Sequence, residues 1–219
     1  TNFSQDHMDY HKSMKKYLGA KLILFKKLLK KNNFLITDKT IPEFKKLKNI
    51  AQKRKLKIKL INSLEKNYDF TNFKLLGNFQ KKNLMMAIIV CETLGLNKKK
   101  ISNCLPKLKS VKGRLELVKE FPDQTKVFVD FAHTPDAINT AIKSLKTYFK
   151  KDITIVFGCG GERDKNKRGK IGKIVNKTCS KIFITDDNPR REKPEAIRKS
   201  IIKFIKKEKV TEIGNRASA

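Results

Sequence analysis

The sequence predicts an α/β protein with a parallel sheet in its second half. Three short apolar runs rich in β-branched residues, at 126–131, 153–157 and 181–185, each lead into a polar loop. Each loop is followed by a segment with apolar residues at three-four spacing, which indicates a helix. This strand-helix alternation predicts parallel strands joined by right-handed crossovers. Because ligands bind beyond the carboxyl ends of such strands, the three loops predict one site.

The first half is expected to alternate helices and strands as well. We expect helices at 13–31, 42–54, 83–94 and 98–108, and strands at 34–36, 56–61 and 68–76. Residues 110–113 have the composition of a linker. The sequence therefore predicts two domains, 1–111 and 112–219, which a chain of 219 residues can accommodate.

Composition excludes several classes of protein. Apolar residues make up 39% of the chain, and no run approaches the length of a membrane span or forms a signal peptide. The cysteines are scattered, without a C-x-x-C pair, and there are only three histidines, so a zinc site is not expected. We expect free thiols and a cytoplasmic protein without membrane insertion.

The formal net charge of +31 makes nucleic-acid binding an obvious alternative. However, most of the 52 basic residues are lysine, whereas arginine is the preferred bidentate reader of phosphate and guanine. The lysines are spread over nearly every expected helix, and the abundance of Lys, Ile and Asn fits AT-rich codons. We favour solvated lysine faces and no specific nucleic acid, and we keep a basic nucleic-acid-binding module as the rival from another class.

The run from Asp186 to Arg190 is the most informative motif. It places two carboxylates and a guanidinium on an Asn-Pro turn directly after an apolar strand. Such a loop suits recognition of a charged small molecule. The alternative is an ordinary turn in which Arg190 pairs with Asp186 or Asp187 at the surface, where ion pairs contribute little. The glycine-rich run 158–161 allows close backbone approach but lacks the G-x-G-x-x-G spacing.

Together these motifs resemble the Mur ligase family over nearly the whole chain. The matching segments are 6–11 (DHMDYH), 113–116 (GRLE), 129–136 (VDFAHTPD), 158–168 and 187–190 (DNPR). The resemblance is to members that add meso-diaminopimelate to UDP-N-acetylmuramoyl-L-Ala-D-Glu in peptidoglycan synthesis. It implies a central ATPase-type domain, a Rossmann-like C-terminal domain, and an ATP-dependent amide ligase that acts through an acyl phosphate. Another amino-acid-adding ligase of the family is the close alternative.

The resemblance also implies roles for individual residues. His7 and Lys21 match metal-site positions, with Lys21 carbamylated, and Lys21 and Lys167 match catalytic lysines. The positions on the ATP side are Asn83, Arg114, Asp130 and His133. Those that contact diaminopimelate are Arg163, Asp187, Asn188 and Arg190. The implied cofactors are ATP and Mg²⁺, and we expect a monomer. From the residues alone, turn, helix-cap and solvated-surface roles stay open, including an Asn83 cap on the helix expected at 83–94.

Two departures from the family pattern matter. Gln80 stands where the family has Asn, which bears on the adenine contact. No G-x-x-x-x-G-K-[ST] phosphate loop occurs anywhere in the sequence. We therefore expect an internal fragment that lacks the upstream part of the central domain and does not catalyse the reaction alone.

Overall fold

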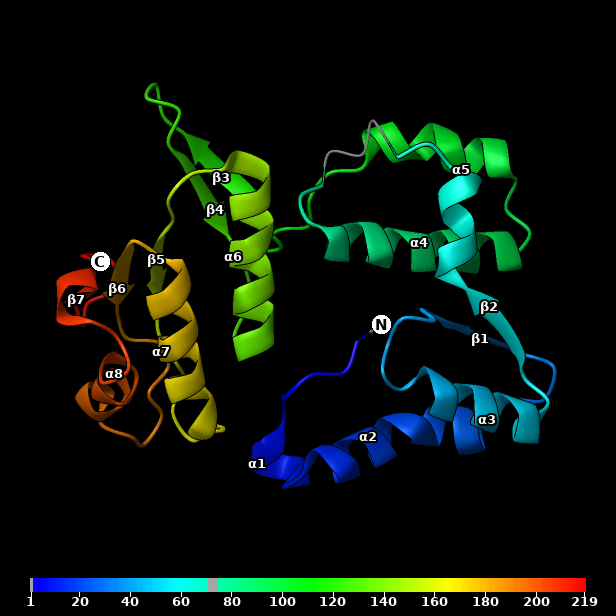
Figure 1. Ribbon diagram of the computed structural model, residues 1–219, viewed down its shortest axis with the longest axis horizontal. Helices are drawn as coiled ribbons and strands as arrows, with labels where there is room; N and C mark the ends of the chain where they lie inside the picture. Colours follow the sequence, from blue (N-terminus) through cyan, green and yellow to red (C-terminus); the bar gives the residue numbers. More distant parts are fainter. Residues whose placement is uncertain (1, 71–74) are drawn as a thin grey trace. The chain divides into compact units, whose positions relative to one another are not determined.

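The structure is a computed structural model that describes residues 2–70 and 75–219 (Figure 1). The chain separates into two compact units along the main chain between Lys112 and Gly113. Residues 4–14 group with the second unit, whereas residues 15–112 belong to the first. The tertiary structure thus joins a short N-terminal segment to residues far along the chain.

The first unit begins with a helix that packs against a small parallel sheet. Helix α2 (Met14–Ile23) continues into a π-helical turn, Leu24–Leu28. Strand β1 (Phe34–Thr37), helix α3 (Phe44–Arg54) and strand β2 (Lys57–Leu60) follow, and the two strands pair in parallel. These elements confirm the helices and strands expected here. Their apolar faces share one core of Leu22, Leu35, Leu47, Ile50, Ala51 and Leu56.

The other described elements of the first unit are helices. Helix α4 (Asn78–Thr93) is followed by α5 (Lys98–Cys104) and a 3₁₀ turn, Leu105–Lys107. The expected start of α4 at residue 83 is wrong, because the helix begins immediately after Gly77, whose φ of 92° suits glycine. The strand expected at 68–76 lies partly outside the described residues, and its described part, 68–70 and 75–76, forms no strand.

The second unit opens with an antiparallel hairpin that was not expected from the sequence. Strand β3 (Glu116–Glu120) pairs with β4 (Lys126–Val129), so the prediction that 126–131 joins the parallel sheet is wrong. A tight turn closes the hairpin: Phe121 N–H donates to the Thr125 carbonyl at 2.8 Å, and Asp123 Oδ1 accepts from Thr125 N at 2.9 Å. Asp after Pro122 favours this chain reversal.

The parallel sheet has the order β5-β6-β7. Strands β5 (Thr154–Phe157) and β6 (Lys181–Ile184) were expected, whereas the third strand, β7 (Val210–Glu212), was not. Helix α7 (Asn166–Thr178) packs against α6 (Pro135–Phe149) and α8 (Pro194–Ile202). Side chains from the helices and strands form one core, which includes the fully buried Ile171, Val175, Ile184 and Ile201. The α/β class with parallel strands is confirmed.

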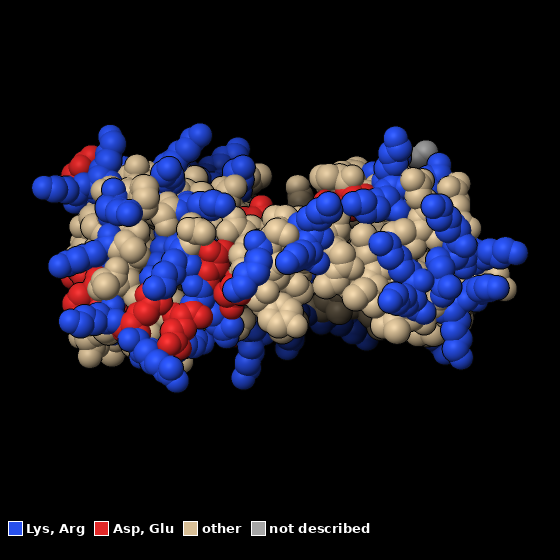
Figure 2. Space-filling view, turned by 90° about the horizontal axis from the view of Figure 1, so that it is seen from below, with Lys and Arg blue, Asp and Glu red and all other residues tan. Residues whose placement is uncertain are grey.

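Lysine and arginine side chains are scattered over the molecular surface. Figure 2 shows them over the whole visible face, without a single continuous stripe. Cations spread in this way suit solvated helix faces better than one track for a nucleic-acid backbone. Within residues 2–70 and 75–219, no helix combines the length and apolarity needed to cross a membrane.

Candidate ligand-binding site beyond strands β5 and β6

The loops after β5 and β6 pack backbone against backbone. A Cβ atom on Gly158 would lie 2.4 Å from the Thr185 carbonyl oxygen, and one on Gly161 would lie 1.8 Å from that of Pro189. The Gly161 N–H also donates to the Asn188 carbonyl at 2.9 Å. Only glycine allows this approach. The run of glycines after β5 therefore serves to join two loops.

Arg190 is held by both loops. Its Nη1 donates to the Gly161 carbonyl at 2.7 Å, and its backbone N–H donates to Asn188 Oδ1 at 3.2 Å. Its φ of 51° is left-handed, which is uncommon for a residue with a side chain. Arg190 makes no ion pair with Asp186 or Asp187, so the surface-pair alternative is wrong. The exposed Arg190, Asn188 and Asp187 remain together at the loop surface.

Asp186 pairs with a residue outside its own loop. It forms an ion pair with Arg198 of α8, whose Nε also donates to Glu212 Oε1 of β7 at 2.6 Å. Arg198 is buried, and the hydrogen bonds from its guanidinium to Glu212 and Asp186 raise its pKa. Asp186 N–H donates to the Gly214 carbonyl at 3.0 Å. Asp186 therefore fastens the loop to the sheet, and Asp187 is the carboxylate left exposed.

The buried ion pair between Arg168 and Glu192 also joins the two loops. Arg168, at 4% exposure, donates from Nη1 and Nη2 to Glu192 at 3.0 and 2.9 Å. Arg168 Nη2 also donates to the Gly160 carbonyl at 3.3 Å. Glu192 Oε1 accepts the Glu162 N–H at 2.6 Å. The hydrogen bonds from Arg168 and from the Glu162 backbone lower the pKa of Glu192 to about 2.

The N-terminal segment 4–14 contacts this region. Gln5 Nε2 donates to Asp164 Oδ2 at 2.7 Å, and Asp9 Oδ2 lies 3.6 Å from Nη1 of Arg163. His7 precedes the short helix α1 (Met8–His11) with a left-handed φ of 55°. Asp6 Oδ2 lies 3.3 Å from Nε2 of His7 and 3.8 Å from Nε2 of His133. The structure thus brings His7, His133 and Arg163 into the same unit.

The loop after β4 carries the residues expected on the ATP side. Asp130 accepts the Leu115 N–H at 2.7 Å on Oδ2 and the Ala132 N–H at 2.8 Å on Oδ1. Each carboxylate oxygen keeps a further lone pair for a ligand. The Arg114 guanidinium stacks over the Phe131 ring at 5.0 Å. The cap of α6 is Thr134, which accepts from Ala137 N at 3.3 Å, so neither Asp130 nor His133 caps this helix.

Comparison with known proteins shows the family of this chain. The model described as "Mur ligase middle domain" matches residues 1–73, and "Mur ligase, glutamate ligase domain" matches residues 113–219. The chain belongs to the Mur ligase family. It is 40% identical over its whole length to the UDP-N-acetylmuramoyl-L-alanyl-D-glutamate–2,6-diaminopimelate ligase of Rickettsia conorii, and 34% identical to that of Buchnera aphidicola. The chain spans 50% and 49% of these relatives, about half their length.

Two solved structures are similar to this chain in fold. A diaminopimelate ligase structure that is 27% identical aligns with 98% of this chain and 49% of its own, with a TM-score of 0.51. The folylpolyglutamate synthase of Mycobacterium tuberculosis, complexed with ADP and AMPPCP, aligns with 97% of this chain and 52% of its own. Its TM-score is 0.76 at 17% identity, so this second likeness concerns the fold alone.

The remaining residues predicted for the site are divided between the units. Lys21 and Asn83 belong to the first unit. Lys21 is exposed on α2 with its Nζ 5.0 Å from the Tyr17 ring centroid, and Asn83 is exposed in the second turn of α4. Asn83 therefore does not cap its helix. Lys167 lies on α7 of the second unit. Burial raises the pKa of the Cys159 thiol to about 11, and the positive charge of Lys167 partly opposes this rise.

The described residues do not form a magnesium centre by themselves. They contain no group of three or more His, Cys, Asp or Glu side chains suited to hold a metal. Asp6 and His7 supply one carboxylate and one imidazole, whereas magnesium prefers an octahedral set of oxygen ligands. Asp6 and His7 alone would not complete the ligand set of a magnesium ion.

A buried carboxylate at the end of β1 was not recognised in the sequence. Asp38 is 1% exposed and accepts from Lys82 Nζ at 2.6 Å, Thr40 N at 2.8 Å and Asn62 Nδ2 at 3.2 Å. Burial alone would raise the pKa of Asp38, but these hydrogen bonds hold it well below its usual value. The signal was available, because Asp38 follows an apolar strand just as Asp186 does.

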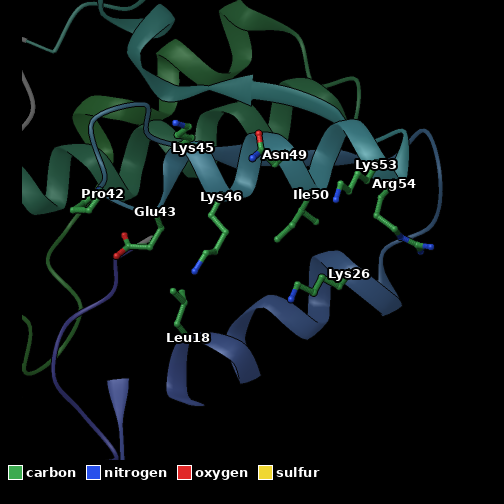
Figure 3. A pocket seen from close by; sticks show the side chains of 10 residues that line it. All are labelled: Leu18, Lys26, Pro42, Glu43, Lys45, Lys46, Asn49, Ile50, Lys53 and Arg54. Carbon is green, nitrogen blue, oxygen red and sulfur yellow. The ribbon is translucent and has the colours of Figure 1, made fainter. Parts of the chain in front are cut away.

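A groove of about 760 Å³ in the first unit contains none of the expected site residues. Figure 3 shows Leu18 and Lys26 on one side and residues of α3 on the other. Half of the lining residues are cationic: Lys26, Lys45, Lys46, Lys53 and Arg54, beside Leu18, Pro42, Glu43, Asn49 and Ile50. Because lysine and arginine are scattered over the visible surface, the cations that line this groove do not by themselves indicate a ligand-binding site.

Proposed function

We propose that this chain is part of an ATP-dependent amide ligase that adds meso-diaminopimelate to UDP-N-acetylmuramoyl-L-Ala-D-Glu. The observation that carries the proposal is the joined pair of loops beyond β5 and β6, which presents exposed Arg190, Asn188 and Asp187. The relatives that share this sequence at 40% identity are named as ligases of diaminopimelate. Residues 1–111 would belong to the central domain and 112–219 to the C-terminal domain.

Arg190 and Arg163 would bind the distal carboxylate of diaminopimelate. A guanidinium pairs with a carboxylate through two parallel hydrogen bonds, and such charge-assisted pairs are among the strongest in proteins. Asp187 and Asn188 would hold the neighbouring ammonium and backbone atoms. Lysine lacks the distal carboxylate and would leave Arg190 unpaired. An alternative family member that adds lysine would be expected to present a different group at this loop.

Residues assigned to ATP occur in each of the two units. Asp130 has a lone pair free on each carboxylate oxygen for the ribose hydroxyls, and Arg114 and Lys167 would bind phosphate. Asn83 would read the adenine edge, with His133 nearby on the nucleotide side. When bound, ATP supplies the phosphoryl group that activates the substrate carboxylate. We carry over His7 and a carbamylated Lys21 as magnesium-site residues from the family pattern alone.

These assignments imply which partners the protein has and where it acts. Its partners would be the UDP-linked dipeptide, diaminopimelate and ATP, and it would act as a monomer in the cytoplasm, where nucleotide-linked precursors and ATP occur. The rival class, a basic nucleic-acid-binding module, needs neither Asp130 nor Arg190. It instead depends on the total charge and on salt concentration.

A chimera tests the proposal directly. In it, this chain replaces the matching half of the Rickettsia conorii relative, and amide formation from ATP, the UDP-linked dipeptide and diaminopimelate is measured. We expect turnover by the chimera and none by residues 1–219 alone, which contain no phosphate-loop motif. A folded chimera that binds ATP yet forms no amide, or one that uses lysine in preference, would contradict the proposal.

A further inference from the structure

We propose that Arg168 and Glu192 are positioning residues whose buried ion pair holds the Arg190 loop in its ligand-binding form. Neither would touch the ligand. The inference concerns this chain's own loops, and its ligand readout rests on the function proposed above. The resemblance to the family assigned no role to Arg168 or Glu192, and this inference gives both a positioning role.

Arg168 is bonded to both loops. Its side chain projects from α7, is 5% exposed and meets Glu192 through two hydrogen bonds of 3.0 and 2.9 Å. This fork matches a carboxylate bidentately, which fixes orientation as well as distance. A third bond, of 3.3 Å, reaches the Gly160 carbonyl in the loop after β5. Both Nη atoms of Arg168 are therefore held by the two loops, and the side chain is buried, although its Nε has no hydrogen-bond partner among the described residues.

Glu192 also contacts both loops. Its side chain accepts the Glu162 N–H at 2.6 Å and lies 3.4 Å from Lys165 Nζ, both in the segment after β5. Its backbone N–H donates to the Pro189 carbonyl at 3.0 Å, which closes the turn that contains Arg190. One residue thus ties the turn of the second loop to the backbone of the first.

Backbone strain occurs in both loops. Arg190 and Glu162 both have φ of 51°, a left-handed conformation that residues with side chains adopt only when their surroundings impose it. Glu192 bonds directly to Glu162 and closes the turn around Arg190. With this pair broken, both residues are expected to relax toward ordinary conformations. The hydrogen bond from Arg190 Nη1 to the Gly161 carbonyl would then no longer aim the guanidinium.

The surrounding charges support a positioning role. Arg163, which pairs with Asp9, and Arg190 are exposed, whereas Arg168 is buried. Arg191, by contrast, is 92% exposed and lies 3.8 Å from Glu162, in a pair of the same chemistry at the surface. A pair in water contributes little, whereas a buried bidentate pair has a defined geometry to lose. Arg191 therefore provides a matched control within the same loop.

The experiment uses the whole 219-residue chain with Arg168→Lys, Glu192→Gln and the control Arg191→Lys. NMR titration measures the dissociation constants of meso-diaminopimelate and L-lysine, and hydrogen exchange measures amide protection across 158–163 and 186–192. We expect roughly tenfold weaker diaminopimelate binding in both clamp variants, because misplacement of a positioned group by about 1 Å has effects of this size or larger. Lysine binding should not change, amide exchange in both loops should accelerate, and Arg191→Lys should behave as the parent.

Each result has a defined meaning. Clamp variants that keep the parent affinity and parent exchange rates overturn the inference. If Arg168→Lys does not fold, Glu192→Gln decides, because it keeps the side-chain volume. Loss of folding in both also overturns the inference, since the pair would then support the whole unit. If the parent chain by itself binds no diaminopimelate, the same titration in the folded chimera decides the proposed substrate, while the exchange rates still decide whether the pair holds the loops.

Discussion

The guanidinium of Arg190 lies 2.7 Å from the carbonyl oxygen of Gly161, which belongs to the loop after the preceding strand. Two segments 29 residues apart therefore present one surface. Because Gly161 has no side chain, its carbonyl can orient the arginine while its N–H binds Asn188.

Arg190→Ala is expected to reduce the preference for diaminopimelate over lysine in the chimeric enzyme. Lysine would not make the charge-assisted hydrogen bonds that Arg190 offers to the distal carboxylate of diaminopimelate, a difference of about 2 kcal/mol, or roughly 30-fold in relative specificity. The ratio of kcat/KM values for the two amino acids measures the effect. Arg191→Ala, at a highly exposed neighbour, should leave the ratio unchanged. An unchanged ratio in the Arg190 variant would remove Arg190 from the specificity site.

Gly161→Ala is expected to destabilise the second unit. The added Cβ would lie 1.8 Å from the Pro189 carbonyl oxygen, so the two loops must separate. We expect a loss of about 1–3 kcal/mol in the free energy of unfolding. Gly19→Ala is the matched control, because a methyl group added there on helix α2 would meet nothing within 4 Å. Alanine at that position should stabilise by up to about 1 kcal/mol. Equal stability of Gly161→Ala and the parent would show that the loops do not pack as described.

The contribution of Glu192 to stability should depend on pH. Its pKa is lowered from an ordinary 4.5 to about 2, chiefly by hydrogen bonds from Arg168. Since the folded state favours the ionised form, the stabilisation is complete above about pH 4.5 and is lost as the pH falls toward about 2. Urea unfolding of the parent and of Glu192→Gln at several pH values measures this. The difference between them should shrink as the pH is lowered, and a constant difference would contradict the pairing.

Asp38→Asn is expected to loosen the first unit. It removes the charge that faces Lys82 and changes one acceptor oxygen to a donor beside Thr40 and Asn62. We expect about 1–3 kcal/mol of destabilisation, typical of a buried hydrogen-bonding group that loses its partner. Thermal unfolding of the two variants Asp38→Asn and Asp123→Asn compares this buried carboxylate with an exposed one. If both variants match the parent, the Asp38 cluster does not stabilise the fold.

Nucleic-acid binding by this chain should be independent of sequence. With lysines scattered over the surface, affinity should follow counterion release and fall steeply between low and physiological salt. Fluorescence anisotropy with several unrelated duplexes over a salt series measures both properties. Asp130→Asn and Arg190→Ala should not change the profile in a way that depends on the duplex sequence. Selective nanomolar binding at physiological salt would instead favour the nucleic-acid-binding class.

The amino-acid sequence alone determined the family and most of the secondary structure. Strands at 34–36, 153–157 and 181–185 were recognisable because β-branched apolar runs and their flanking polar loops are local patterns. The family motifs are likewise contiguous runs, such as 129–136 and 187–190, so they are readable without a fold. For the same reason the exposed Arg190, Asn188 and Asp187 could be named as candidates before any contact was known.

Only the tertiary structure decided which residues act together. Strand β4 pairs with β3 and not with the parallel sheet, and the short β7 joins β6, because strand pairing depends on partners elsewhere in the chain. Arg168 meets Glu192 across 24 residues, and Gln5 meets Asp164 across 159. Charged residues are common in this sequence, so composition and spacing do not distinguish a buried pair from a solvated one. Burial and bidentate geometry do, and both arise only when the chain has folded.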